Sequence, residues 1–342
     1  MKCPVCGMDC VRSSKDLLAT LPGIFLPCPE CSTRVLDKRR PHTPLDFAEP
    51  CSCGKRFIDE VFAHIYVIMV EEGDLSRTDP LIAAGSPLIH PGFAMDRPPF
   101  LPRDSLVLLS ARVNQKAAGR IVNEVPEVRG VVKTGDFVPG IADPGLESVP
   151  RVYELLAGCD VRADIFPLGT GPLVMYKQQS LVHIEFPRSG YPKLQSVINH
   201  IGNPPAPLFV DACCGVGTLG LTAACSGVPY VITNDAWYAS AFWAAFNLEV
   251  NRQYLRISKI RIFEQYRDLQ KHPVVRNPLK IAETEGDQVI EVYQGDFRLL
   301  HHILTSPPAL SVIDLFNKKD RAANELVLKE WKERIGGEVF IP

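Results

Sequence analysis

The segment FVDACCGVGTLGL at residues 209–221 constrains the fold more than any other part of this sequence. Its apolar start predicts a buried strand, and the glycines after it predict a tight turn into a helix that ends at Gly227. From residue 208 onward, strand patterns and helix patterns alternate along the chain. This alternation predicts βαβ units and therefore a parallel sheet.

Four more strands and two long helices are expected after this unit, with strands at 230–235, 291–296, 310–316 and 338–342 and helices at about 236–251 and 319–335. The proline-rich stretch at 203–207 can continue neither a helix nor a central strand, so it marks a boundary. We therefore predict an α/β chain in which residues 204–342 form a Rossmann-like parallel sheet. The sheet is expected to end at its fifth strand, which leaves an edge for the middle domain or a protein partner.

Three acids end three successive strands of this unit. Asp211 ends the first strand, Asp235 the second and Asp296 the third. Because the carboxyl ends of parallel strands converge on one crevice, these carboxylates could accept hydrogen bonds from hydroxyl and amino groups of a single ligand. Two alternatives stay open. The glycines at 215–220 also match a dinucleotide-binding loop, and each acid taken singly could cap a turn or a helix.

The sequence DACCGVGT at 211–218 resembles the first motif of class I (Rossmann-like) S-adenosylmethionine (SAM) methyltransferases, particularly RNA methyltransferases with D-x-F-C-G-x-G. The resemblance covers about residues 208–342. It implies SAM as the cofactor, held by residues of the glycine turn and of the following strand ends: Asp211, Gly215, Gly217, Asp235, Asp296 and Phe297.

The resemblance also implies a role for each acid. Asp211 would lie near the methionine part, Asp235 would accept both ribose hydroxyls, and Asp296 would read the adenine amino group. The helix at 234–252 resembles the corresponding helix of tRNA methyltransferases, with its terminal N-x-x-x-N. More loosely, the stretch from 129 to 186 is similar to the domain that precedes the catalytic domain in archaeal tRNA guanine methyltransferases.

The end of the fourth strand holds the substrate site in this family, commonly as Asn- or Asp-Pro-Pro-Tyr. Here Asp314 and Asn317 stand at that place, and the proline-proline-aromatic form is absent. Asp314 could orient an acceptor or act as a base, and Asn317 could hydrogen-bond the acceptor. Alternatively, Asp314 caps a helix that starts near Lys318. The segment at 305–308 is expected to be an ordinary loop.

The paired cysteines Cys213 and Cys214 lie beside the predicted cofactor turn. Cysteine packs like a small hydrophobic residue, and the sequence places no base beside this pair. We therefore interpret both as small residues in a tight turn, with a nucleophile as the alternative.

Seven of the eleven cysteines fall in the first 53 residues, six of them as pairs: Cys3 and Cys6, Cys28 and Cys31, Cys51 and Cys53. Two C-x-x-C pairs have the spacing of a zinc ribbon, in which four thiolates hold zinc. The first and second pairs could form the ribbon, or equally the second and third, and a second ion is possible if Cys10 joins. Residues 1–75 are predicted to form this domain, closed by a helix at about 55–72.

Residues 76–203 are rich in proline and glycine and contain short β-type runs at 105–113, 129–134 and 180–186. They predict a small mixed α/β domain. The net charge of −2 gives no general attraction to nucleic acid, so an RNA contact would need a local patch. The basic stretch at 251–280, with aromatic residues among its cations, could track phosphates and stack bases. The alternative is a solvated amphipathic helix whose aromatic residues face the core.

No positively charged start followed by an apolar run opens the sequence, and the longest apolar stretch is too short to span a membrane. A cytoplasmic protein is expected. Together these features predict a SAM-dependent methyltransferase whose acceptor is tRNA-like RNA, bound through the basic stretch and the ribbon. Two alternatives remain: a methyltransferase that acts on a protein or a small molecule, and a SAM-binding zinc-ribbon scaffold without catalysis.

Overall fold

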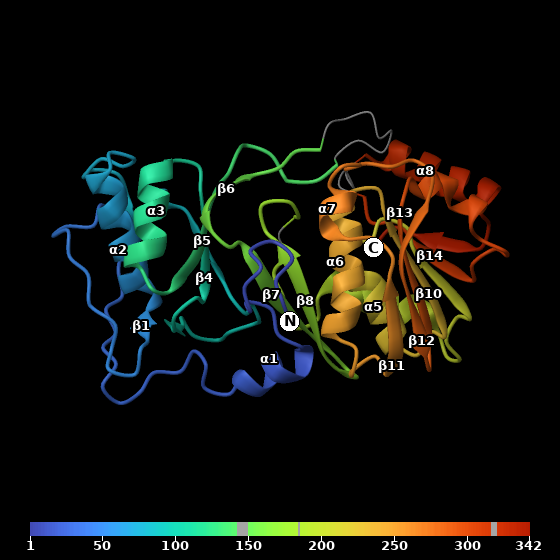
Figure 1. Cartoon of the computed structure of the whole chain (residues 1–342), viewed down its shortest axis with the longest axis horizontal. Helices are drawn as coiled ribbons and strands as arrows, with labels where there is room; N and C mark the ends of the chain where they lie inside the picture. Colours follow the sequence, from blue (N-terminus) through green and yellow to red (C-terminus); the bar gives the residue numbers. More distant parts are fainter. Residues whose placement is uncertain (142–149, 184, 316–319) are drawn as a thin grey trace.

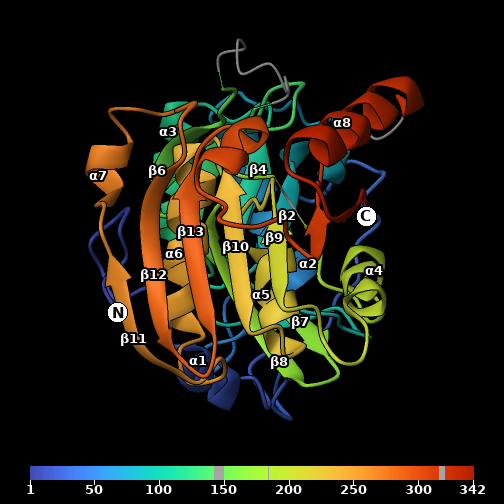
Figure 2. The same ribbon diagram turned by 90° about the vertical axis from the view of Figure 1, so that its right-hand side faces the viewer.

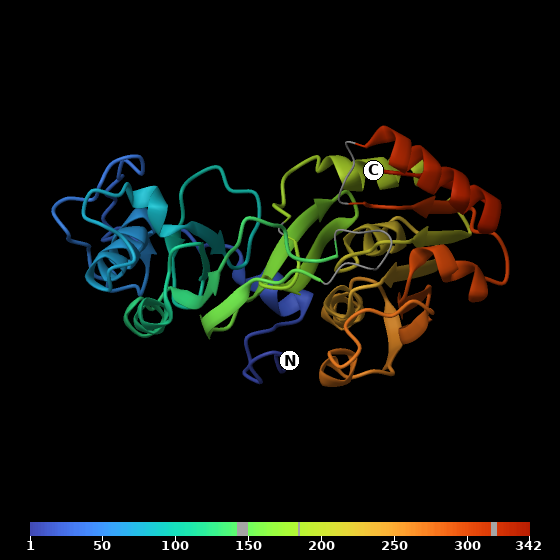
Figure 3. The ribbon, with the colours of Figure 1, turned by 90° about the horizontal axis from the view of Figure 1, so that it is seen from above.

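A computed structural model describes residues 1–141, 150–183, 185–315 and 320–342 of the chain (Figure 1). The molecule is elongated, with the helices Ile58–Glu71 and Gln115–Glu124 at one end and a large sheet at the other. A long β-hairpin, drawn in green, lies between these two parts (Figure 3). The predicted mixed α/β class is confirmed. Among the described residues, no helix is both long and apolar enough to cross a membrane.

The large sheet has seven strands in the order β11-β12-β13-β10-β9-β14-β15 (Figure 2). Five of them are parallel: β9 (Leu208–Asp211), β10 (Tyr230–Asp235), β13 (Val289–Gln294), β14 (Leu310–Val312) and β15 (Glu338–Phe340). The chain enters at β9, runs outward through β10 to β13, and returns to the other side of β9 with β14. The strand order therefore reverses between β9 and β14, where open α/β sheets form their ligand crevice.

Both faces of this sheet are covered. Alternate residues of β9 point to opposite faces, so that Phe209 packs with the helices α5 (Thr218–Cys225) and α6 (Tyr238–Val250). Val210 packs on the other face with Trp331 of α8 (Arg321–Arg334) and with the 3-10 helix η2 (Phe297–His302). Helix α4 (Pro192–Ile201) joins the first of these cores. The apolar residues of β9 are therefore buried on both sides of the sheet.

One edge of the sheet carries an antiparallel addition, in which β11 (Ile257–Ile262) pairs with β12 (Leu279–Gly286) and β12 pairs with β13. The short helix α7 (Tyr266–Leu269) lies between β11 and β12. The other edge is β15, as expected from the sequence. It is a three-residue strand, and short edge strands limit unwanted pairing with other chains.

The N-terminal part has a second core around a four-stranded sheet with the order β2-β4-β5-β6, formed by Ser86–Ile89, Leu106–Ser110, Val128–Lys133 and Glu154–Gly158. Helices α2 (Ile58–Glu71) and α3 (Gln115–Glu124) pack on it. The strands predicted at 105–113 and 129–134 are present as β4 and β5. A small β1 (Arg56–Phe57) pairs with β3 (Phe100–Leu101), and the 3-10 helix η1 (Leu81–Ala84) precedes β2.

The first residues of the chain do not share this N-terminal core. Cys3 and Val11 pack into the core of the large sheet, and so does Leu17, which lies on helix α1 (Ser14–Thr20). By contrast, Phe25 and α2 pack with β4 and β5. The chain thus crosses from one core to the other near residue 21. The division at residues 75 and 203 stays a prediction.

The hairpin of β7 (Val161–Leu168) and β8 (Gly171–Gln178) joins the two parts. The Asn247 side chain of α6 accepts a hydrogen bond from the Tyr176 backbone N at 2.8 Å and donates to the Tyr176 backbone O at 2.9 Å. Asn251, one turn later, makes the same pair of bonds with Val174. The N-x-x-x-N sequence of α6 therefore acts as a substitute strand partner for β8.

The strand predicted at 180–186 is wrong for the described part of that run. Residues 180–183 form a turn instead, in which the Leu181 and Val182 backbone N atoms donate to the Gln178 backbone O at 3.2 Å. The buried carboxylate of Asp160 accepts a hydrogen bond from the Ser180 backbone N at 2.6 Å. This side chain takes the place of a neighbouring strand.

Replacing Asn247 with alanine tests the link between α6 and the hairpin. The change leaves the buried backbone N and O of Tyr176 without partners, so we expect the free energy of unfolding to fall by about 2–4 kcal/mol. Urea denaturation measures it. Asn199→Ala, at an exposed site on α4, serves as the control and is expected to stay within about 0.5 kcal/mol of wild type. Equal effects of the two changes would contradict the role of Asn247.

Candidate functional site

A cavity of 770 Å³ opens at the carboxyl ends of β9, β10, β13 and β14. Its wall comes from the glycine turn after β9, the ends of the three other strands and α8. Residues 138–141, 181–183 and 185 complete it from the N-terminal side. Ligand pockets commonly have volumes of about 300–1,000 Å³ and mostly apolar walls with a few convergent polar groups. The cavity lies at the reversal of strand order, as the sequence pattern predicts.

Three glycines shape the turn between β9 and α5. Gly215 and Gly217 have φ angles of 53° and 91°, in the left-handed region that favours glycine. Gly215 lines the cavity, and a Cβ atom added there meets no atom within 4 Å. At Gly220, a Cβ would lie 2.3 Å from Cγ2 of Thr233, so this glycine allows α5 to pack on β10. The turn thus brings backbone to the edge of the cavity.

Asp211 lies beneath this turn and is fully buried. Its Oδ2 accepts a hydrogen bond from the Gly220 backbone N at 2.8 Å, and its Oδ1 has no hydrogen-bond partner among the described residues. Burial raises the pKa of this carboxyl well above its usual range. The cavity wall does not include Asp211, so its contact with a cofactor stays a prediction.

Asp235 lines the cavity directly. Its Oδ2 accepts a hydrogen bond from the Gly215 backbone N at 2.9 Å, and its Oδ1 accepts one from the Trp237 backbone N at 2.9 Å. A carboxylate oxygen can accept two hydrogen bonds, so acceptor capacity is left for a ligand. Burial raises the pKa of Asp235 to about 7, against the opposing effect of the two backbone donors.

Asp296 and Phe297 also line the cavity, at the end of β13. Asp296 begins η2, and its Oδ1 accepts a hydrogen bond from the Arg298 backbone N at 3.0 Å. The Arg298 guanidinium adds a pair of bonds, 2.8 Å from Nε to Oδ1 and 2.7 Å from Nη2 to Oδ2. The capping alternative therefore applies to Asp296. Recognition of an adenine amino group by this residue stays a prediction.

Asp314 follows β14 and also lines the cavity. Its Oδ2 lies 2.6 Å from Nζ of Lys193, which is 3.6 Å from the carboxylate of Glu185. Burial alone would lower the pKa of Lys193, but the two carboxylates outweigh it and raise this pKa. Sequence reasoning missed Lys193 and Glu185. The sole local signal was Pro192, which is typical of the first turn of a helix.

The other sequence-predicted residues at this site are placed as follows. Asn317 and the helix start expected near Lys318 lie outside the described residues; helix α8 is capped by Asp320, which accepts a hydrogen bond from the Ala323 backbone N at 3.0 Å. Burial raises the pKa of the Cys213 and Cys214 thiols well above the usual range, which disfavours the thiolate that a nucleophile needs. The segment at 305–308 is a loop, as expected.

The cysteines of the N-terminal region form two groups of four. Cys28, Cys31, Cys51 and Cys53 make one group, and Cys3, Cys6, Cys10 and Cys159 make the other. The second and third cysteine pairs thus lie together, whereas the first pair lies elsewhere. In the group that contains Cys28, the Sγ atoms of Cys28 and Cys51 are 3.6 Å apart, and those of Cys31 and Cys53 are also 3.6 Å apart. Four thiolates around zinc at Zn–S distances of about 2.3 Å stand about 3.8 Å apart, so the donor set fits zinc.

The basic stretch at 251–280 is not a helix but contains β11, α7 and the start of β12. Its cations stand beside acids across the hairpin: Lys259 Nζ is 3.6 Å from Glu285, and Lys280 Nζ is 2.7 Å from Glu291. Two of its three aromatic residues are also engaged, because the hydroxyl of Tyr254 bonds Thr170 and that of Tyr266 bonds Gln178. Phe263 is exposed. The local charge is therefore largely balanced.

No family model matches this sequence, and no curated protein matches it. Among solved structures, the chain is similar to Trm1 from Pyrococcus horikoshii with S-adenosyl-L-methionine, at 14% identity and a TM-score of 0.37, over 52% of this chain and 42% of that one. The M. jannaschii tRNA m1G37 methyltransferase is similar at 13% identity and a TM-score of 0.37, over 78% of this chain and 60% of that one. P. horikoshii TYW2 in complex with MeSAdo is similar at 14% identity and a TM-score of 0.37, over 68% of this chain and 65% of that one.

The chain thus spans between 42% and 65% of the length of these three proteins. At these identities and TM-scores, the likeness carries no conclusion about the activity of this chain.

Replacing Asp235 with asparagine tests its raised pKa. In the unfolded chain, this carboxyl loses its proton near pH 4, whereas the folded protein keeps it up to about pH 7. Its contribution to stability is therefore fully present below pH 4 and is lost as the pH rises to 7. We expect the wild type to lose on the order of 1–2 kcal/mol relative to Asp235→Asn between pH 5 and pH 8, measured by urea denaturation.

The same comparison with Asp287→Asn provides the control, since Asp287 is exposed in the turn between β12 and β13. Stability curves that run parallel for the wild type and Asp235→Asn over this pH range would show that Asp235 ionises normally.

Proposed function

We propose that this chain is a methyltransferase that binds SAM in the cavity at the carboxyl ends of β9, β10, β13 and β14. The observation that carries the proposal is that the Gly215 turn, Asp235 and Asp314 meet around one largely apolar cavity. SAM bears ribose hydroxyls and amino groups, which can donate hydrogen bonds to carboxylates. It also carries the methyl group to be transferred on a positively charged sulfur. Asp235 would hold the ribose, and Phe297 would pack near the base.

The cavity wall offers carboxyl oxygens as hydrogen-bond acceptors. Four acids line it, namely Glu185, Asp235, Asp296 and Asp314. Basic groups stand beside two of them, since Lys193 lies 2.6 Å from Asp314 and Arg298 lies 2.7 Å from Asp296. Asp211 adds a further carboxyl directly beneath the turn, with one oxygen lacking a partner among the described residues. These oxygens suit a ligand rich in hydroxyl and amino groups, which donate hydrogen bonds.

The hydrogen bonds of the turn argue against a dinucleotide. In dinucleotide-binding folds, free backbone N–H groups at the start of the first helix face a pyrophosphate. Here the Gly220 N–H bonds the buried Asp211, and the Gly215 N–H bonds Asp235. Two backbone donors of the turn are thus already bonded to carboxyl groups and are not available to a pyrophosphate.

Asp235→Ala tests the cofactor site. Loss of hydrogen bonds to a carboxylate typically costs about 1.5–3 kcal/mol, so we expect SAM to bind about 10- to 100-fold more weakly. Isothermal titration calorimetry measures the dissociation constant. Asp287→Ala, an exposed acid in the turn after β12, is the matched control and should leave it unchanged. Binding of NAD by the wild type without binding of SAM would overturn the proposed cofactor.

Two further residues of the cavity wall, Lys193 and Asp314, support the proposal of a catalytic role. Methyl transfer is an in-line displacement, so an enzyme mainly aligns the acceptor and takes up its proton. The Asp314 carboxylate is held by the Lys193 ammonium, and both residues line the cavity, as Asp235 does. We propose that Asp314 orients an acceptor or takes its proton. Asn317, three residues further on, stays a proposed partner of the acceptor.

We propose RNA as the acceptor, and tRNA-like RNA in particular. The resemblance of residues 208–252 to RNA methyltransferases supports it, together with the cysteine group of the proposed zinc ribbon at Cys28, Cys31, Cys51 and Cys53. One observation favours a small molecule or a protein instead: the cations at 251–280 stand beside acids, so this hairpin offers little net charge to a phosphate backbone. A protein partner at the short edge strand β15 remains a further proposal.

Transfer of label from SAM carrying a radioactive methyl group distinguishes these acceptors. We incubate the wild type with fractionated RNA, protein and metabolites, and expect label in the RNA fraction. Asp314→Asn is expected to slow transfer on the order of 10²-fold, with little change in the dissociation constant of SAM. Label in the protein or metabolite fraction would replace RNA with that acceptor class. SAM binding without transfer to any fraction would favour a scaffold without catalysis.

A further inference from the structure

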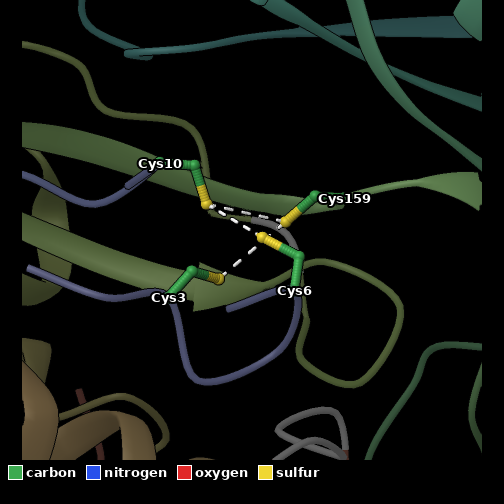
Figure 4. Close-up of side chains that lie close together, drawn as sticks. All are labelled: Cys3, Cys6, Cys10 and Cys159. Carbon is green, nitrogen blue, oxygen red and sulfur yellow. Dashed lines mark hydrogen bonds between the residues drawn. The ribbon is translucent and has the colours of Figure 1, made fainter. Parts of the chain in front are cut away.

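Cys159 stands apart from the other cysteines of its group in the sequence. It lies between β6 and β7, 156 residues after Cys3. Its Sγ is 3.9 Å from that of Cys3 and 3.8 Å from that of Cys10, and the Sγ atoms of Cys6 and Cys10 are 3.4 Å apart. The four sulfurs all lie within 4.8 Å of one another and point toward a common centre (Figure 4).

These separations match a tetrahedral metal site. Four sulfurs at about 2.3 Å from zinc stand about 3.8 Å apart, close to the spacings around Cys159. A disulfide requires sulfurs about 2.05 Å apart. The group that contains Cys28 has the same spacing, with 3.7 Å between the Sγ atoms of Cys28 and Cys31.

The backbone of both groups forms the same kind of turn. The Cys3 backbone N donates to the Met8 O at 2.8 Å, and Gly7, with φ of 73°, donates from its N to the Cys3 O. In the other group, the Cys51 N donates to the Lys55 O at 2.9 Å, and Gly54, with φ of 77°, donates to the Cys51 O. Each turn points a pair of thiols to one side and is closed by a left-handed glycine. The first turn is therefore built like the second, although the sequence spacing differs.

The surroundings of the Cys159 group balance a negative centre. Four thiolates around one Zn²⁺ carry a net charge of −2. The Arg12 backbone N, two residues after Cys10, donates a hydrogen bond to the Tyr176 hydroxyl at 3.1 Å. The Arg129 backbone O accepts a hydrogen bond from the Cys159 N at 2.8 Å, and Nε of this buried arginine has no partner among the described residues. A basic residue thus contacts the backbone of Cys159 directly.

We propose that Cys3, Cys6, Cys10 and Cys159 bind a second zinc ion as a structural site that fastens residues 1–12 to the β7-β8 hairpin. Each thiol releases its proton to solvent as it binds, so one Zn²⁺ displaces four protons and no electron is transferred. Cys159 precedes Asp160, whose carboxylate holds the Ser180 backbone N at 2.6 Å. Through this contact, the zinc site supports the turn that continues into the cavity wall at Leu181.

The zinc content of the purified full-length chain tests the proposal. By elemental mass spectrometry, we expect two zinc ions per chain for the wild type and one for Cys159→Ser. Cys53→Ser removes a ligand of the other group and should also retain one. Cys225→Ser is the control, because Cys225 on α5 belongs to neither group, and it should retain two. None of these counts depends on the proposed SAM site.

X-ray absorption at the zinc edge keeps the test decisive if Cys159→Ser fails to fold. The zinc left in Cys53→Ser should be bound by four sulfurs at about 2.3 Å. Cleavage by a protease near residues 1–12 should become faster in Cys159→Ser than in Cys225→Ser. One zinc per wild-type chain, no zinc in Cys53→Ser, or iron in place of zinc in that variant would each overturn the proposal.

Discussion

The amide of Asn247 is the interaction on which the arrangement of this molecule depends most. One side chain bonds both backbone groups of Tyr176 in the hairpin, and its Nδ2 also donates to the Val216 backbone O of the glycine turn at 3.1 Å. Helix, hairpin and turn therefore hold one relative position. Val216 and Lys177 of the hairpin both line the cavity, so the same amide holds two parts of its wall together. A polar group buried this deeply is stable because all its bonds are made.

Local patterns predict the large sheet well, since each strand and helix carries its own periodicity. The glycine turn and Asp235 follow from residues close together in the sequence, and both lie on the cavity wall. Lys193, Glu185 and Cys159 could not be found in this way. Each acquires its position through contacts with distant segments, such as the 121 residues that separate Lys193 from Asp314. The strand expected at 180–186 fails for a related reason, because the Asp160 carboxylate replaces a strand as partner.

Charge patterns mislead where strands pair. The stretch at 251–280 is strongly basic in the sequence, but β12 places Glu283 and Glu285 across from the cations of β11. Cross-strand pairing brings residues more than 20 positions apart within reach, so the sign of a surface depends on the register and not on the composition of one segment. The same holds for residues close together in the sequence. The sequence predicts that Asp296 contacts a ligand, but in the structure it is paired with Arg298.

The spread of the cysteines along the chain has a consequence for biosynthesis. The cysteines from 28 to 53 complete their group early, when little more than the first 53 residues have left the ribosome. The group of Cys3 waits for Cys159, and at about 5–20 residues per second that delay is on the order of ten to thirty seconds. During this interval, three thiols at the start of the chain are exposed to oxidants and to competing metals. The segment of Cys3, Cys6 and Cys10 therefore reaches its final place only after Cys159 has been made.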